Sequence, residues 1–328
     1  MKRNKLVILF LVGLLLVTTC ASLQLNAAAP RTLKLAEVHP QGYPTELGDE
    51  KFAELVAAKS KGRLKIQVYF GGQLGSENDV VEQAKLGVIE FVRVSTSPVI
   101  SVYKPIGVFS MPFLFRSQEH QWKVLKGEVG QTFLKGMESV GLVGLTYFDG
   151  GARNFYATKE LKSVNDLKGL KIRVQPSPIM VSMIKLLNAT ATPIAYGEVY
   201  SALQTGVVDG AENNVPSWVS ANHYEVAKYF IKDGHLRLPE LLMVSKKFYD
   251  GLSKRDQKIL RDAAREATEF QIKAWNESES KYLEQAKAKG CVIHEANVAE
   301  FQAAVAPMYD MPEYKEYKVW VDKIKAVK

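Results

Sequence analysis

Two arginines lie where a guanidinium can meet a carboxylate. Arg173 stands between Ile172 and Val174, in a run where apolar and polar residues alternate, and Arg153 follows the Gly-Gly-Ala segment 150–152. A guanidinium offers a planar fork of donors that matches both oxygens of a carboxylate. The two residues therefore predict an anion-binding site. The alternative for each is an arginine exposed on a strand or paired with a nearby acid.

Two further polar side chains can complete such a site. Asn213 ends the polar stretch 209–213, and its amide can donate to a carboxylate or accept from a hydroxyl. Asparagine is also common in turns, which is the alternative here. Tyr196 either lines the same pocket or packs in the core, and we interpret Trp218 as a packing residue.

The histidines do not form a pattern typical of a metal or catalytic site. The sequence has no His-Glu-x-x-His motif and no Gly-x-Ser-x-Gly motif, and segment 71–75 matches neither a P-loop nor a dinucleotide fingerprint. We therefore expect a protein that is not an enzyme, with no catalytic residues, no cofactor and no metal. The histidines are His39, His120, His223, His235 and His294.

The charge balance argues against nucleic acid as a partner. The chain has 43 basic and 35 acidic residues, with a formal net charge of +8, and its basic residues do not gather in one stripe. Nucleic-acid binding needs such a stripe, whereas a mild positive excess suits the capture of small anions. The cysteines are Cys20 and Cys291, so we expect no internal disulfide in the exported chain.

The N-terminus has the pattern of a secretory signal, which we assign to residues 1–29. Basic residues precede the apolar run 6–17, which is too short to cross a hydrocarbon core of about 30 Å. The alternatives are lipid attachment at Cys20 and a buried N-terminal helix. We expect the exported chain to be periplasmic or otherwise extracytoplasmic, and not membrane-spanning because no later apolar run is long enough.

Strand and helix patterns alternate along the rest of the chain, which predicts a mixed α/β architecture. The longest helical pattern, 256–289, would measure about 50 Å at 1.5 Å per residue, enough to span two lobes. The expected strands are 33–38, 64–68, 88–94, 140–147, 170–174, 206–211 and 241–245, and the expected helices are 47–59, 76–85, 122–135, 179–187, 196–204 and 256–289.

Several segments, in this order along the chain, resemble the substrate-binding subunits of TRAP transporters, the tripartite ATP-independent periplasmic class. The similarity covers nearly all of the chain after the signal. The segments are Gly-Gln-Leu-Gly-Ser-Glu at 72–77, Met-Pro-Phe-Leu-Phe at 111–115, Leu-Lys-Gly-Leu-Lys-Ile-Arg-Val at 167–174, Ile-Ala-Tyr-Gly-Glu-Val-Tyr-Ser-Ala-Leu-Gln-Thr-Gly at 194–206 and Val-Asp-Gly-Ala-Glu-Asn at 208–213.

The resemblance implies a two-lobe periplasmic binding protein fold. Each lobe is then a mixed sheet flanked by helices, a long helix spans both lobes, and the lobes close on the ligand at a hinge. We place lobe I at 30–150 plus 239–278 and lobe II at 151–238 plus 279–328. Partners implied by the family are the small and large membrane subunits of a TRAP transporter, and we expect the binding protein to be a monomer.

The resemblance also assigns roles to residues. It implies that Arg173 clamps the ligand carboxylate, that Arg153 is a second arginine at the lobe boundary, and that Asn213 and Tyr196 contact the ligand. Glu77 and Ser95 occupy positions that face the pocket in sialic-acid-binding relatives. Ser95 replaces an acid there and Val38 replaces an asparagine, so sialic acid itself is not expected.

Other polar residues lie near predicted strand ends and can bond the hydroxyls of a sugar acid. The alternative to ligand contact for each histidine is an ordinary surface residue or a hydrogen-bonded loop residue. The stretch 213–218 with 223–225 is similar to a branch that includes uronate binders, so we expect a hexuronate or related sugar acid. A C4-dicarboxylate is the alternative ligand, and a module that presents its ligand to a receptor is the alternative function. The additional candidate residues are Glu37, His39, Gln175, His235 and Glu240.

Overall fold

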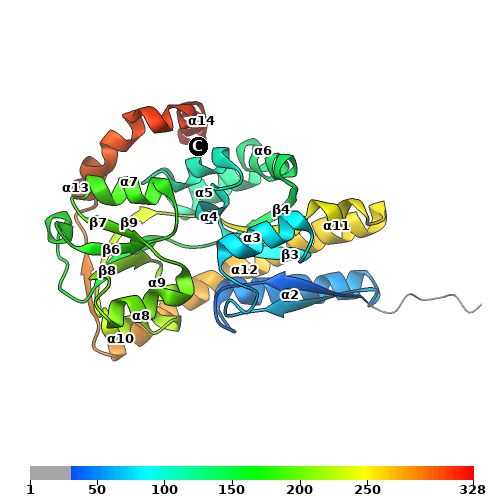
Figure 1. Cartoon of the computed structure of the whole chain (residues 1–328), viewed down its shortest axis with the longest axis horizontal. Helices are drawn as coiled ribbons and strands as arrows, with labels where there is room; N and C mark the ends of the chain where they lie inside the picture. The colour runs from blue at the N-terminus through cyan, green and yellow to red at the C-terminus, as the bar shows by residue number, and fades with distance from the viewer. Residues whose placement is uncertain (1–30) are drawn as a thin grey trace, which may run out of the picture. The chain divides into compact units, whose positions relative to one another are not determined.

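The computed structural model describes residues 31–328, so the predicted signal peptide and Cys20 lie outside the described residues. Residues Thr32–Lys328 form one compact unit. The unit contains two β-sheets with helices packed around them, and in Figure 1 the first sheet lies to the right and the second to the left. The predicted mixed α/β fold is confirmed.

The first sheet has the strand order β2-β1-β3-β10-β4. Strand β1 runs parallel to β3, whereas β10 is antiparallel to both β3 and β4. Every residue of β3 is buried, as expected for a central strand. The strands are β1 (Arg31–Ala36), β2 (Leu64–Tyr69), β3 (Phe91–Ser95), β4 (Leu142–Phe148) and β10 (Glu240–Ser245).

The second sheet has the order β11-β9-β5-β8-β6-β7. Strand β6 runs parallel to both β7 and β8, and β5 is antiparallel to β8 and β9. Its strands are β5 (Arg153–Ala157), β6 (Lys171–Val174), β7 (Thr190–Pro193), β8 (Gly210–Asn213), β9 (Tyr229–Leu236) and β11 (Val292–Glu295).

Helices cover both sheets (Figure 1). The α-helices are α2 (Pro44–Lys59), α3 (Glu77–Leu86), α4 (Thr96–Val99), α5 (Gln118–Lys126), α6 (Glu128–Gly136), α7 (Pro178–Leu186), α8 (Val199–Gln204), α9 (Val215–Ser220), α10 (His223–Val226), α11 (Lys246–Asp250), α12 (Lys254–Ala288), α13 (Val298–Val305) and α14 (Lys318–Ala326). The 3₁₀-helices are η1 (Lys104–Ser110), η2 (Met137–Val140), η3 (Val164–Leu167), η4 (Tyr196–Glu198), η5 (Ala306–Asp310) and η6 (Pro312–Tyr317).

The predicted long helix is α12, with 35 residues. It packs on α2 and β4 beside the first sheet and on α9 beside the second, so it spans both. Its buried side chains recur at helical spacing, from Leu260 and Ala264 to Gln271 and Trp275. This spacing keeps one apolar stripe of the helix against the rest of the molecule along most of its length.

The first crossing between the sheets, from β4 to β5, is held by α12 and α5. The side-chain amide of Gln271 donates to the backbone carbonyl of Asp149 (3.0 Å) and accepts from its N–H (2.7 Å). The Asp149 carboxylate accepts from Gln118 Nε2 (2.7 Å), Trp122 Nε1 (2.9 Å) and the N–H of Gly151 (2.8 Å). Gly151 has a φ of +62°, and an added Cβ would lie 2.6 Å from the ring of Trp275, so only glycine fits this bend.

Two of the proposed lobe boundaries, 150/151 and 238/239, fall in the connections that join β4 to β5 and β9 to β10, and the third, 278/279, falls within α12, on the path from β10 to β11. The C-terminal segment, which we placed in lobe II, passes back to the first sheet's side. There α14 packs against α6 (Figure 1). The ring centroids of Trp320 and Phe133 lie 4.8 Å apart. The division into two lobes stays a prediction.

The structure corrects some of the expected elements. The single helix expected at 122–135 is two helices, because Gly127 adopts an extended conformation between α5 and α6. Asn213 is the last residue of β8 rather than a turn residue. The capping role expected of Ser76 is confirmed, since its side chain and that of Asp79 cap each other's backbone N–H groups.

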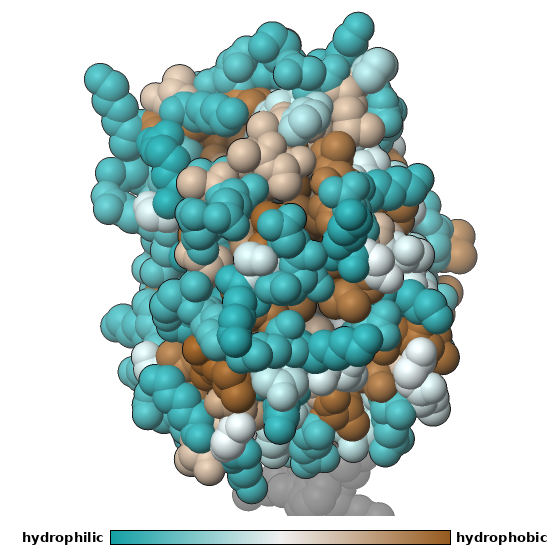
Figure 2. Space-filling view, turned by 90° about the vertical axis from the view of Figure 1, so that its left-hand side faces the viewer, coloured by the Kyte–Doolittle hydropathy of each residue, from teal (hydrophilic) through white to brown (hydrophobic). Residues whose placement is uncertain are grey.

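Within residues 31–328, no helix combines the length and apolar character needed to cross a membrane. Figure 2 views the side that carries the second sheet, and hydrophilic side chains cover most of this face, with smaller hydrophobic patches between them.

Candidate functional site

A narrow cleft lies where the first sheet's strand ends meet those of the second. His39 follows β1, Ser95 ends β3, and Asn213 ends β8, so the cleft collects side chains from the carboxyl ends of parallel strands, as is usual in α/β proteins. The side chains nearly fill the cleft, and the cavity that remains between them measures about 10 Å³. The lining residues are Val38, His39, Glu77, Ser95, Arg153, Gln175, Tyr196, Asn213, Asn214 and Glu240.

Most of the predicted site residues therefore meet at one place. The exceptions are Arg173, Glu37 and His235, which are buried but do not belong to the lining of the cleft. Their contacts decide what each of them can do.

Arg173 is buried in β6, between β7 and β8, with 1% of its surface exposed. Its Nε donates to the backbone carbonyl of Ile194 (2.9 Å), whereas its Nη1 has no hydrogen-bond partner among the described residues. Burial lowers the pKa of the guanidinium, and the negative charge of Glu212 opposes this. Arg173 is thus neither turned into solvent nor bonded to a protein acid, and a buried donor remains for an anion.

Arg153 follows the alternative considered from the sequence, because it is paired with an acid. Its Nε and Nη2 donate to the carboxylate of Glu212 (2.5 and 2.8 Å), and its Nη1 donates to Oδ1 of Asn213 (2.9 Å). Burial opposes the charge of Arg153, but Glu212 raises the pKa above its usual value. Arg153 still lines the cleft, so it can orient Asn213 and contribute positive potential there.

The carboxylate of Glu212 lies between the side chains of His235 and Arg153. Its Nδ1 is 2.8 Å from Asp233 Oδ2, its Nε2 is 3.5 Å from Glu212 Oε2, and its ring stacks on Phe155 at 4.3 Å. Burial would lower the pKa of His235, but Asp233 and Glu212 raise it to about 9, so the ring is charged at neutral pH. His235 does not line the cleft in this structure, and its expected contact with a ligand hydroxyl stays a prediction.

The sequence reasoning missed Arg93, the main cation on the first sheet's side. Arg93 is fully buried in β3 and bonds the carboxylates of both Glu37 and Glu240, and its Nη2 lies 2.7 Å from His39 Nδ1. Glu37 also accepts from Thr45 Oγ1 (2.9 Å), so it sits behind the cleft as a partner of Arg93. A charged residue inside the apolar run Phe-Val-Arg-Val-Ser was the signal that could have revealed it.

Glu77 and Ser95 both line the cleft and contact each other. The backbone N–H of Ser95 donates to Oε1 of Glu77 (2.7 Å), and Glu240 is the cross-strand partner of Ser95 on β10. Burial and the charge of Glu240 raise the pKa of Glu77. Ser95 Oγ and Gln175 Oε1 are buried and have no hydrogen-bond partner within residues 31–328, so both can bond a polar solute.

The aromatic rings of His39 and Tyr196 line the cleft, and the ring of Tyr43 packs behind His39. His39 stacks on Tyr43 (3.8 Å between ring centroids) and meets Tyr196 at 4.7 Å. The hydroxyl of Tyr43 lies 2.8 Å from Ser217 Oγ and donates to Asn214 Oδ1 (3.2 Å), which joins the start of α2 to the start of α9. Burial lowers the pKa of His39 to about 4, so this ring is neutral at pH 7.

The described residues contain no group of three or more His, Cys, Asp or Glu side chains placed to hold a metal ion. The lining of the cleft offers carboxylate and amide groups, and Arg173, buried outside this lining, has a guanidinium donor without a partner among the described residues. Such an arrangement suits an organic anion that also carries hydroxyl groups.

Two α/β sheets joined through crossing segments, with a polar cleft between their strand ends, define the class of two-lobed solute-binding proteins. The model of the family described as bacterial extracellular solute-binding protein, family 7, matches residues 35–316. The chain belongs to this family, and the predicted resemblance to TRAP solute-binding subunits is confirmed.

Curated relatives agree with this assignment. A solute-binding protein of Chromohalobacter salexigens is 38% identical over 275 residues, which cover 83% of this chain and 82% of the relative. The C4-dicarboxylate-binding periplasmic protein DctP of Rhodobacter capsulatus is 31% identical over 330 residues, or 97% of each chain.

Solved structures are similar along the whole fold. A TRAP periplasmic solute-binding protein of Xanthobacter autotrophicus, solved with bound β-D-galacturonate, is 39% identical with a TM-score of 0.86, and the match covers 90% of this chain and all of that one. The corresponding protein of Pseudomonas putida, solved with bound D-glucuronate, is 36% identical with a TM-score of 0.88, covering 91% of this chain and 98% of that one.

Proposed function

We propose that this protein captures a hexuronate or a related sugar acid outside the cytoplasm and delivers it to the membrane subunits of a TRAP transporter. The observation that carries the proposal is the buried Nη1 of Arg173, which lacks a hydrogen-bond partner in the described part of the chain. A carboxylate at this position forms charge-assisted bonds that the protein itself does not supply.

The lining of the cleft itself favours a ligand with hydroxyl groups. Glu77, Glu240 and Gln175 offer oxygen acceptors, and Asn213 offers an amide. The bound galacturonate and glucuronate of the two similar structures have one carboxylate and several hydroxyls, which is the chemistry that such a lining can bond.

Capture works by closure of the two lobes. The carboxylate end of the ligand meets Arg173 from the second sheet, while its hydroxyls meet Glu77 and Glu240 from the first sheet's side. A ligand that contacts both sides binds the closed form better than the open form, so it shifts the population toward closure. The closed form then docks on the small and large membrane subunits.

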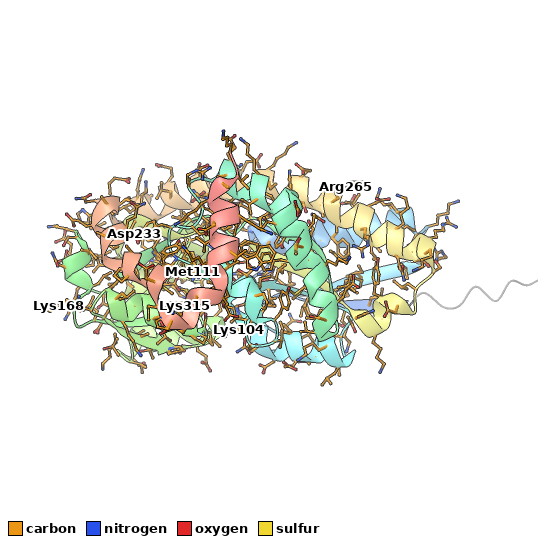
Figure 3. The ribbon with its side chains drawn as sticks, turned by 90° about the horizontal axis from the view of Figure 1, so that it is seen from above. Lys104, Met111, Lys168, Asp233, Arg265 and Lys315 are labelled. Atoms are coloured by element: carbon orange, nitrogen blue, oxygen red, sulfur yellow. The ribbon has the colours of Figure 1, made fainter. Side chains whose placement is uncertain are left out.

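The test is calorimetric titration of Arg173→Ala with D-galacturonate and D-glucuronate. Loss of a charge-assisted pair costs about 2–5 kcal/mol, which corresponds to a Kd at least roughly 30-fold higher at 1.4 kcal/mol per tenfold. Arg265→Ala is the control, because Arg265 is an exposed residue of α12, paired with Asp262 (Figure 3). An unchanged Kd for Arg173→Ala would remove the carboxylate clamp from the proposal.

A C4-dicarboxylate remains the second candidate ligand, because the Rhodobacter capsulatus relative is named for it. Titration of the wild type with succinate and malate beside the uronates separates the two. Tighter binding of the C4 acids would replace the hexuronate proposal.

A further inference from the structure

The charges around the cleft are unevenly divided between its two sides. On the second sheet's side, the cations Arg173, Arg153 and His235 stand against the carboxylates of Glu212 and Asp233. This side therefore has a surplus of positive charge, which one carboxylate of a ligand would balance.

The first sheet's side has the opposite surplus. Arg93 stands against three carboxylates, those of Glu37, Glu77 and Glu240. Its guanidinium is already engaged by Glu37, Glu240 and the ring of His39. Arg93 thus has little to offer an incoming anion.

Two of these carboxylates face the cleft side by side. Glu77 accepts from the N–H of Ser95 (2.7 Å), and Glu240 is the strand neighbour of Ser95, so the two acids flank one residue. Burial and the proximity of Glu240 raise the pKa of Glu77, which is the sign of two acids that already repel each other in a site with little water. A third carboxylate at this place would add to the repulsion, whereas a hydroxyl would donate to it.

On the basis of the proposed function, we propose that the cleft selects polyhydroxylated acids with a single carboxylate, and that Glu77 and Glu240 reject a second carboxylate. The ligand class is then the monoacids of sugars, such as uronates. Aldarates, in which both ends of the sugar chain are carboxylates, are excluded. Glu77 and Glu240 are specificity-determining residues.

A matched pair of ligands tests the charge without changing the carbon chain. L-Galactonate and D-galactarate are both open six-carbon chains with a carboxylate at one end, and they differ at the other end, which is a hydroxymethyl group or a second carboxylate. D-Galacturonate serves as the reference ligand. We expect galactarate to bind at least 30-fold more weakly than L-galactonate, about 2 kcal/mol at 1.4 kcal/mol per tenfold.

Glu77→Gln tests the assigned residue, because the amide keeps the shape and the acceptor for Ser95 but removes the charge. We expect the ratio of the two Kd values to fall at least fivefold in this variant. Glu82→Gln is the control, since Glu82 lies on the same helix α3 but is exposed and paired with Lys85. Thermal unfolding of each variant verifies that it is folded.

The outcomes separate this inference from the proposed function. If galacturonate binds and galactarate binds within threefold of L-galactonate, the selection rule fails while the proposed function stands. If none of the sugar acids binds, the proposed function fails. If neither open-chain acid binds the wild type, a gain of galactarate binding by Glu77→Gln supports the rule, and the lack of such a gain overturns it. If Glu77→Gln does not change the ratio of the Kd values for galactarate and L-galactonate, Glu77 does not determine this selectivity.

Discussion

Arg93 and Arg173 occupy equivalent settings in the two sheets and have opposite surroundings. Each is a fully buried arginine within a strand, flanked by apolar neighbours in the sequence. Arg93 is bonded to Glu37 and Glu240, whereas Arg173 bonds only a backbone carbonyl through its Nε and leaves Nη1 without a partner among residues 31–328. The two arginines therefore differ in their hydrogen-bond partners, and not in burial or residue type.

The strongest expected difference between the two arginines concerns stability. Arg93→Met removes the partner of two buried carboxylates, and leaving such charges unpaired typically costs about 3–5 kcal/mol. Arg173→Met leaves no bonded acid behind, so we expect its free energy of unfolding to change by less than about 1 kcal/mol. Chemical denaturation without ligand measures both.

The binding data should show the reverse order. Arg173→Met is expected to lose the sugar acid while remaining folded. A large loss of stability in Arg173→Met together with a small loss in Arg93→Met would show that Arg173, and not Arg93, is the arginine that stabilises the fold.

The two sheets also hold buried histidines with opposite pKa shifts. Burial lowers the pKa of His39 to about 4, whereas Asp233 and Glu212 outweigh burial and raise that of His235 to about 9. Because the folded-state pKa of His235 exceeds its unfolded value, its contribution is fully present below about pH 6.5 and is lost as the pH rises through 9. The shift corresponds to stability on the order of 3 kcal/mol.

We therefore expect the free energy of unfolding to fall between pH 7 and pH 9.5, and to fall less in His235→Gln. His294→Gln is the matched control, because His294 is a more exposed histidine on β11 that pairs with Glu160. Denaturation curves across this pH range provide the measurement. Equal pH profiles in the wild type and His235→Gln would show that His235 is not charged in the folded protein.

The sequence predicted the architecture well and the partners of charged side chains poorly. The helix 76–85 was predictable because Ser76 caps its start and Gly87 ends it, and both are local signals. The central strands were readable as apolar runs. By contrast, β9 carries Lys232, Asp233 and His235 within one strand, which obscures any alternating pattern.

The roles of the arginines depended on contacts that are distant in sequence. Glu212 lies 59 residues from Arg153, and Glu240 lies 147 residues from Arg93. No local pattern encodes such a pairing, because it arises only when strands from different parts of the chain become neighbours in a sheet. The sequence could therefore nominate Arg153 and Arg173 together, but it could not tell which one carries an internal partner.

The smallest expected effect concerns Tyr43, which joins the two sides of the cleft without lining it. Its hydroxyl contacts Ser217 and Asn214, and these bonds can form only when α2 and α9 are close together. Tyr43→Phe removes them and keeps the stacked ring against His39. A hydrogen bond of this kind contributes about 0.5–1.5 kcal/mol.

If these bonds belong only to the closed form, Tyr43→Phe lowers the closed population and raises the Kd of every ligand by the same factor, roughly 2–10-fold. Uronates, aldonates and aldarates should weaken in parallel, whereas Glu77→Gln changes their ratios. Tyr200→Phe is the control, since Tyr200 is a tyrosine of α8 whose hydroxyl bonds Glu225 within the second sheet's side. Titration of the same ligands with all three variants provides the measurement. A change in the ratios with Tyr43→Phe would mean that this hydroxyl affects the ligand site itself and not the closure of the two sides.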